Sequence, residues 1–237
     1  MGIHVVGDRS CIRVELGRGA VIAAHPVALP VRPRTLAQLR VVARTCVSCA
    51  RCEGATQTVL GAGPAHARLV FIGEHPDEEE DRVGRPFVGA VGAMLDDACR
   101  AAGIDRASVY VTNSVKHSRV RTVAKRRVIT QPNAREIEAC RIWWRAELDL
   151  VKPDVVVCFG AVAARAVLGR SRYRVERHRG EWHRIDNRRV VATMHPAAVL
   201  RAGKDRGERY SDLVDDLALV AGFLDRASSS RSRRAGS

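Results

Sequence analysis

Ionisable side chains follow two apolar runs that lie far apart in this sequence. Glu74 comes directly after the run 69–73, and His195 follows the run 189–194. The carboxyl ends of parallel strands meet at one edge of a sheet, so a carboxylate and an imidazole can converge there. Such a pair suits acid–base chemistry, or the stabilisation of charge that develops during a reaction. Asn113, at the end of a third apolar run, adds an amide that both donates and accepts hydrogen bonds.

A second group of residues that could do chemistry is built from cysteines. The chain has seven, and Cys46, Cys49 and Cys52 are spaced as C-x-x-C-x-x-C. In a chain outside the secretory pathway this spacing indicates metal ligation or redox chemistry before disulfides. The N-terminus lacks the coherent apolar stretch of a secretory signal, so we expect a cytoplasmic protein.

Composition narrows the possible partners. The 237 residues are 46% hydrophobic, which is enough to bury a substantial core in one globular domain. No apolar run approaches the roughly 20 residues that span a bilayer, so no membrane partner is expected. The formal charge of +14 favours polyanions as partners, although it could also serve solubility alone.

The elements that must position these residues follow from hydrophobic periodicity. Strands are expected at 69–73, 109–113, 154–159 and 189–194, and the first three are short continuous apolar runs, which are typical of parallel strands buried on both faces. Helical periodicity alternates with them at 91–102, 133–150, 160–168 and 209–226. This alternation predicts an α/β fold, a three-layer α/β/α sandwich around a central, mainly parallel four-stranded sheet.

The chain divides into three parts by composition. Residues 1–35 are irregular and form an extension of uncertain structure, and residues 36–226 form the folded domain. Residues 227–237 consist mainly of Ser, Arg and small residues, which predicts a disordered basic tail.

Three motifs in chain order resemble those of the iron–sulfur uracil-DNA glycosylases. They comprise Gly-Glu-x-Pro at 73–76 with Glu-Asp at 80–81 and Gly-Arg-Pro-Phe-Val-Gly at 84–89, Val-Thr-Asn-x-Val-Lys at 111–116, and His-Pro at 195–196. The basic run 125–129 and the segment 178–181 are similar to the X family within that superfamily. The resemblance covers about residues 46–224. It implies a uracil-DNA glycosylase-like fold and the hydrolytic excision of uracil from single- or double-stranded DNA, which leaves an abasic site.

The resemblance assigns roles to the strand-end residues. His195 would hydrogen-bond the carbonyl oxygen of the departing base, and Glu74 would orient water or stabilise the cationic sugar. Phe87 would stack on the flipped base, and Asn113 would read the Watson–Crick edge of uracil. The remaining members of the expected site are Gly73 and Asp77 in the wall of the base pocket, and His75 as a second candidate base. Each residue also has an ordinary structural role open to it, such as helix capping for Glu74.

A basic segment follows the second motif. Residues 114–135 contain no acidic side chain, which suits binding to DNA phosphates, although a solvated charged loop is the alternative. The expected DNA-binding residues are Arg119, Arg121, Lys125, Arg126, Arg127 and Ile129. Relatives in the X family have, at the position of Ile129, a His that becomes covalently attached to DNA. Ile has no nucleophilic atom, so we expect no stable covalent adduct.

The cysteine pattern fits the ligand order of the family's [4Fe-4S] cluster. The expected ligands are Cys46, Cys49, His117 and Cys140. Three thiolates and an imidazole also suit zinc, and Cys52 competes with His117 as a ligand. We expect a monomer in which the cluster is structural.

Two other functions remain open at this stage. Ile129, Asp77 and Ala197 depart from the family pattern, which favours a non-catalytic or weakly active binder of uracil-containing or damaged DNA. A DNA-binding protein that uses the cluster as a redox sensor is the second alternative.

Overall fold

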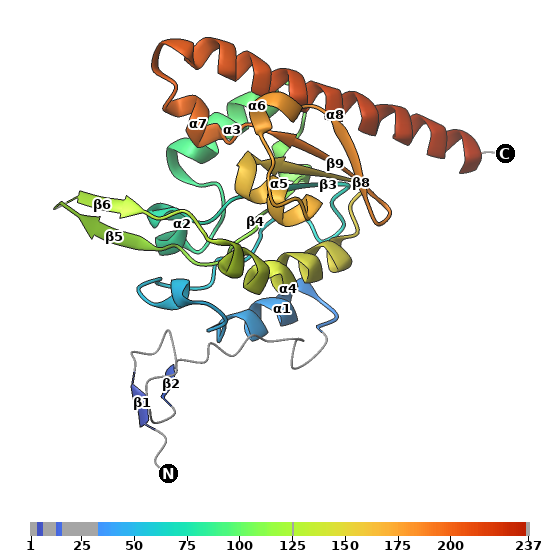
Figure 1. The fold of residues 1–237 in the computed structure, drawn as a ribbon. Coiled ribbons are helices and arrows are strands. Elements are labelled where there is room, and N and C mark those ends of the chain that lie inside the picture. The colour runs from blue at the N-terminus through green and yellow to red at the C-terminus, as the bar shows by residue number, and fades with distance from the viewer. Residues whose placement is uncertain (1–3, 7–12, 16–32, 125, 236–237) are drawn as a thin grey trace.

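The computed structural model describes residues 4–6, 13–15, 33–124 and 126–235 (Figure 1). Most of the expected extension, residues 1–35, lies outside the described residues. Two strands within it, β1 (His4–Val6) and β2 (Arg13–Glu15), pair in antiparallel fashion.

A five-stranded sheet forms the centre of the molecule, with the strand order β4-β3-β7-β9-β8. Its strands are β3 (Leu69–Gly73), β4 (Tyr110–Asn113), β7 (Val155–Phe159), β8 (Trp182–Ile185) and β9 (Arg188–Thr193). All neighbouring pairs are parallel except β8–β9. The mainly parallel sheet is therefore confirmed, with a fifth strand that was not expected. A tight turn at Asp186, whose φ is 52°, joins this edge strand to β9.

Helices cover both faces of the sheet and complete the three layers (Figure 1). The four longest in the described residues are α3 (Gly89–Ala101), α4 (Ala134–Val151), α5 (Gly160–Leu168) and α8 (Arg206–Ala235). Side chains alternate along each strand, so Phe71 packs with α3 and α8, whereas Val70 packs with α4 and α5. Each fully buried aliphatic or aromatic side chain contributes about 1.5–3 kcal/mol.

A smaller core joins the N-terminal part of the described chain to α4. Helix α1 (Leu36–Ala43), capped by Thr35, packs on α4 through Leu39 and Trp143. The turn η1 (Ala50–Cys52) follows it and holds part of the cysteine run. These contacts bring the cysteines next to the helix that carries Cys140.

Short elements flank the ends of the strands. They are α2 (Glu78–Val83), η2 (Arg106–Ser108), α6 (Val175–His178), α7 (Pro196–Leu200) and η3 (Gly203–Asp205). The basic segment, expected as a loop, contains a two-stranded hairpin of β5 (Val120–Val123) and β6 (Arg126–Ile129). The hairpin projects from the body of the molecule (Figure 1).

Helix α8 differs from the expected C-terminal part of the chain. It continues to Ala235, so helical backbone replaces the disorder expected for residues 227–235. The domain limits themselves stay a prediction. Within the described residues, no helix combines the length and apolarity needed to cross a membrane.

Candidate active site

Three of the expected site residues meet at the carboxyl ends of β3 and β4. Gly73 and Asn113 are register partners on these strands. A Cβ placed on Gly73 would lie 2.2 Å from Asn113 Oδ1 and 2.8 Å from Phe87 Cζ. Only glycine therefore allows the amide of Asn113 and the ring of Phe87 to approach the strand end together.

Phe87 is held in an unusual backbone conformation. Its φ is 53°, in the left-handed region that large side chains rarely adopt. Its backbone N–H donates to Glu80 Oε1 at 2.6 Å, which fixes this conformation. The ring stacks on His195 with 5.7 Å between centroids. The stack therefore places His195 directly beside Phe87.

Glu80 is a site residue whose role the sequence did not reveal. Its Oε2 accepts a hydrogen bond from Asn113 Nδ2 at 2.9 Å, and its side chain is buried. Burial, and next the nearby charge of Asp77, raise the pKa of Glu80 to about 7. A carboxylate that accepts from Nδ2 leaves Asn113 Oδ1 facing Gly73 at the strand end. The Glu-Asp pair lies in the first motif and both acids are buried, but its spacing does not reveal that Glu80 is the one that contacts Asn113.

Asp77 has a structural role. Its side chain caps α2 and accepts from the backbone N–H of Glu80 at 2.8 Å. The cap accounts for an acidic residue at this position without any contact to a base.

Glu74 directly follows β3, and its carboxylate lies against the first turn of α5. Its Oε1 accepts from the backbone N–H of Val162 at 2.9 Å. Gly160, with φ 88°, makes room for it, since a Cβ there would lie 2.4 Å from that oxygen. Burial raises the pKa of Glu74, while the helix start and the charges of Arg165 and Arg201 oppose the rise. Glu74 therefore caps α5, a helix distant in the sequence, whereas the helix that follows it, α2, is capped by Asp77.

The two imidazoles of the site are uncharged at neutral pH. Burial, then His75, then Arg201 lower the pKa of His195 to about 3. Burial and the charge of Arg51 lower the pKa of His75 to about 4. His195 Nδ1 accepts from the backbone N–H of Ala197 at 3.2 Å, which leaves the proton on Nε2. His195 is thus a neutral hydrogen-bond donor. Arg201, close enough to shift both His195 and Glu74, was not expected from the sequence.

The expected DNA-binding residues differ in their exposure and contacts. Arg121 is exposed on β5, whereas the guanidinium of Arg119 lies 3.0 Å from Glu136 at the root of the hairpin. Ile129 pairs with Val120 across the hairpin. Lys125 and the side chains of Arg126 and Arg127 lie outside the described residues.

Lys116 belongs to the basic segment but does not reach its surface. Its Nζ is buried and donates to Glu147 Oε2 at 2.6 Å, to Thr112 Oγ1 at 2.6 Å and to the Asn113 carbonyl at 2.7 Å. This lysine therefore fixes the end of β4 to α4, and it is unavailable to DNA phosphates.

The expected cluster ligands lie near one another between α1, α4 and the segment after β4. Hydrogen bonding with Cys140 and the proximity of His117 lower the pKa of Cys49 to about 5, so its thiolate is favoured. The thiol of Cys140 has a raised pKa because it is buried beside Cys49. Cys46 accepts from Trp143 Nε1 at 3.2 Å. Cys52, on η1, is disulfide-bonded, so the expectation that it competes with His117 as a ligand is wrong: a disulfide sulfur offers no thiolate to a metal.

The donor set fits a thiolate-bound metal group. Thr58 Oγ1 lies 2.9 Å from His117 Nε2, whereas the buried His117 Nδ1 has no hydrogen-bond partner among the described residues. An imidazole held this way presents a free lone pair to a metal. In the described part of the chain, no three His, Cys, Asp or Glu side chains are gathered tightly enough to hold a single metal ion.

Comparison with known proteins supports the motif pattern. A family model described as the uracil DNA glycosylase superfamily matches residues 60–218. The chain is 32% identical over 184 residues to a type-4 uracil-DNA glycosylase of Thermotoga maritima, covering 76% of this chain and 90% of that protein. It is 33% identical over 198 residues to the type-4 uracil-DNA glycosylase of Pyrobaculum aerophilum, covering 81% and 96%. A type-5 uracil-DNA glycosylase of the same organism is 28% identical over 180 residues, covering 68% and 76%.

Proposed function

This chain belongs to the uracil DNA glycosylase superfamily, and we propose that it removes uracil from DNA by hydrolysing the N-glycosidic bond. The observation that carries the proposal is the meeting of Gly73, Phe87 and Asn113 at the strand ends, with His195 stacked on Phe87. The base must leave the stack to reach these residues, in single-stranded or duplex DNA.

Asn113 reads the flipped base in this proposal. Its Oδ1 accepts from uracil N3–H, and its second Nδ2 hydrogen donates to O4. Cytosine presents an acceptor at N3 and a donor at position 4, so the same amide orientation rejects it. The contact with Glu80 supports this assignment because it turns Oδ1 away from the carboxylate.

His195 stabilises the leaving base. As the bond from C1′ to N1 breaks, its electron pair passes to the base, and negative charge grows on the base's carbonyl oxygens. The neutral imidazole donates a hydrogen bond from its Nε2–H to one of those oxygens, and this contact stabilises the growing negative charge and lowers the barrier. Because the pKa of His195 is lowered, its imidazole is neutral, which supports a role as a hydrogen-bond donor and not as an acid that gives its proton to the base.

Water completes the reaction at C1′. Its oxygen bonds to the cationic sugar carbon, and one of its protons is lost to the surroundings or to the base. Glu74 would stabilise the sugar cation and orient this water, with His75 as the alternative base. Ile129 offers no nucleophilic atom at the position where X-family relatives have a His, so no covalent adduct with DNA persists.

The cluster, the X-family likeness and the monomeric state belong to the same proposal. Cys46, Cys49, His117 and Cys140 would hold a [4Fe-4S] cluster that ties α1 to α4, with zinc as the alternative. His117 and the basic hairpin support the likeness to the X family. Exposed Arg121 supports phosphate contacts by that hairpin.

The test uses uracil-containing single-stranded and duplex oligonucleotides. One half of each reaction is treated with alkali, which cleaves abasic sites, and the other half is boiled and run on a denaturing gel. We expect cleavage at uracil and no boil-resistant protein–DNA band. Failure to cleave at any salt concentration would reject the enzymatic function, and tight binding without release would favour the non-catalytic binder.

A pair of variants tests the role of position 129. Ile129→His restores an imidazole where X-family relatives have one, and Val120→His places the same group on the cross-strand neighbour as a control. We expect a boil-resistant band with Ile129→His alone. A band from both variants, or from the wild type, would contradict the assignment.

A further inference from the structure

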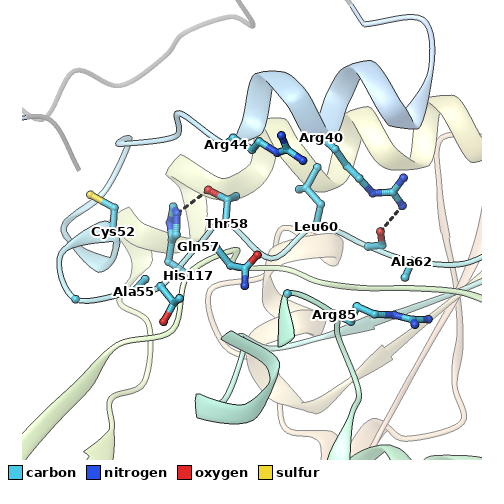
Figure 2. Close-up of a pocket in the computed structure, with 14 residues that line it drawn as sticks. Arg40, Arg44, Cys52, Ala55, Gln57, Thr58, Leu60, Ala62, Arg85 and His117 are labelled. Carbon is cyan, nitrogen blue, oxygen red and sulfur yellow. Dashed lines mark hydrogen bonds between the residues drawn. The ribbon is translucent and has the colours of Figure 1, made fainter. Parts of the chain in front are cut away.

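A large cavity lies beside the expected cluster ligands and shares His117 with them. It measures about 870 Å³ and opens between α1, the segment 54–62 and the turn after α2 (Figure 2). In Figure 2, Arg40 and Arg44 reach it from α1, whereas Arg85 stands on the opposite side, with Gln57 between them. Such a cavity is large enough for a nucleotide-sized ligand.

The described lining is basic and carries no acidic side chain. Arg40 donates to the Gly61 carbonyl at 2.8 Å, which fixes its guanidinium at the edge of the cavity. The side chains of Arg44 and Arg85 form no ion pair or hydrogen bond with any described residue. Two guanidinium groups that have no partner among the described residues, on facing walls, suit an anion with more than one charged position, because arginine binds phosphate in a bidentate manner.

The wall between the arginines is held in place by hydrogen bonds. Asp81 Oδ2 accepts from the backbone N–H of Thr56 at 2.7 Å, and the Asp81 carbonyl accepts from Gln57 Nε2 at 2.8 Å. The backbone N–H of Val59 donates to the Lys116 carbonyl at 2.8 Å. The cavity is therefore built before a ligand arrives, which lowers the entropic cost of binding.

The cavity is also close to the candidate active site along the chain. Arg85 precedes Phe87 by two residues, and His117, which lines the cavity, follows Asn113 by four. The segments 85–87 and 113–117 therefore each contribute to both places.

We propose that this cavity binds the sugar–phosphate backbone of single-stranded DNA next to the flipped uracil. Arg44 and Arg85 contact successive phosphates from opposite walls, and Gln57, whose Nε2 donates to the Asp81 carbonyl, forms the fixed wall between them. The proposal rests on the proposed function for its link to uracil, but phosphate binding at the cavity can be measured without it.

The test compares affinities for a uracil-free single-stranded oligonucleotide over a range of salt concentrations. The variant is Arg44→Gln with Arg85→Gln, made in the protein purified with its metal content intact. The control is Arg100→Gln with Arg141→Gln, which removes two exposed arginines that pair with acids on their own helices. Each lost phosphate contact should lower the slope of log K against log salt by about 0.7, so the double variant should lose about 1.4. We also expect about a tenfold weaker affinity near physiological salt, against little change in the control.

Three outcomes decide the matter. Equal slopes and affinities for the variant and its control would overturn the proposal, whether or not uracil is excised. Binding of dTMP alone can be detected as a rise in the thermal unfolding temperature. If dTMP stabilises the wild type but not the variant, while the two bind single-stranded DNA equally well, the cavity binds a free nucleotide and the proposal is overturned. A reduced slope in a protein that never releases uracil would reject the proposed function while supporting the cavity as a DNA-binding site.

Discussion

At the scale of single residues, Glu80 connects the two parts of the base site. One carboxylate oxygen holds the strained backbone of Phe87 and the other holds the amide of Asn113. Both partners are donors, so the site needs an acceptor at each oxygen. This requirement makes Glu80 a positioning residue that acts through Asn113, although it need not touch the base.

Replacing Glu80 by Gln should loosen the recognition of uracil. Gln offers one acceptor and one donor, so either Phe87 N–H loses its partner or the Asn113 amide turns over. Losing a hydrogen bond to a charged group costs about 1.5–3 kcal/mol, which corresponds to about 10- to 100-fold in kcat/KM for uracil excision. Single-turnover excision from an oligonucleotide measures this loss. Glu79→Gln, at an exposed neighbour, should stay near the wild type. Equal losses in both variants would remove the special role of Glu80.

The pH dependence of activity and stability should reflect the same carboxyl group. In the folded protein the pKa of Glu80 is about 7, above its ordinary value of 4.5, so folding binds its proton more tightly. The protonated group therefore favours the fold fully below pH 4.5, and this stability is lost as pH rises through about 7. Excision should increase over the same range as the carboxylate forms. Thermal unfolding and excision between pH 5 and 8 should both depend less on pH in Glu80→Gln. An unchanged profile in that variant would contradict the assignment.

At the scale of elements, apolar runs predicted the parallel strands well because strands buried on both faces require continuous Val, Ile, Leu and Phe. They did not predict β8, since an edge strand is only partly buried and its pattern is mixed. The hairpin was also hidden, because charged residues dominate its second strand. The site residues at strand ends could be named from motifs. The role of Glu80, which lies in the first motif, and that of Arg201 could not be predicted, because they arise from contacts with residues distant in sequence.

Helix α4 holds the end of β4 through a buried ion pair, and breaking that pair should destabilise the fold. Glu147 accepts from Lys116 Nζ, Tyr110 OH and the Gly61 backbone N–H. Glu147→Ala leaves Lys116 buried without its counter-charge, so the free energy of unfolding should fall by about 3–5 kcal/mol. Urea denaturation measures this change. Glu138→Ala, an exposed acid on the same helix, should change it by less than about 0.5 kcal/mol. A small effect from Glu147→Ala would mean that this ion pair does not hold β4 in place.

At the scale of the whole molecule, three segments distant in sequence converge beside the sheet. Cys46 and Cys49 follow α1, His117 follows β4, and Cys140 lies on α4. Packing between Leu39 and Trp143 joins α1 to α4, but α1 is a short helix of 8 residues and contributes only a small apolar surface. The buried Arg51 adds hydrogen bonds from η1 to the His117 and Thr130 carbonyls. A group that bridges all three segments would therefore close long loops that the small core alone holds weakly.

Removing one expected ligand should release that group and loosen the N-terminal part of the described chain. Cys140→Ser should abolish bound iron and sulfide, and it should lower the free energy of unfolding by several kcal/mol, since metal binding contributes to folding. Metal analysis and thermal unfolding measure both effects, and zinc in place of iron would identify the alternative metal. Cys99→Ala is the matched control, because Cys99 is equally buried but lies on α3, where burial raises its pKa to about 12 and disfavours the thiolate that a metal requires. The control should lose some stability through its cavity and keep its full metal content. Full metal retention in Cys140→Ser would exclude Cys140 as a ligand.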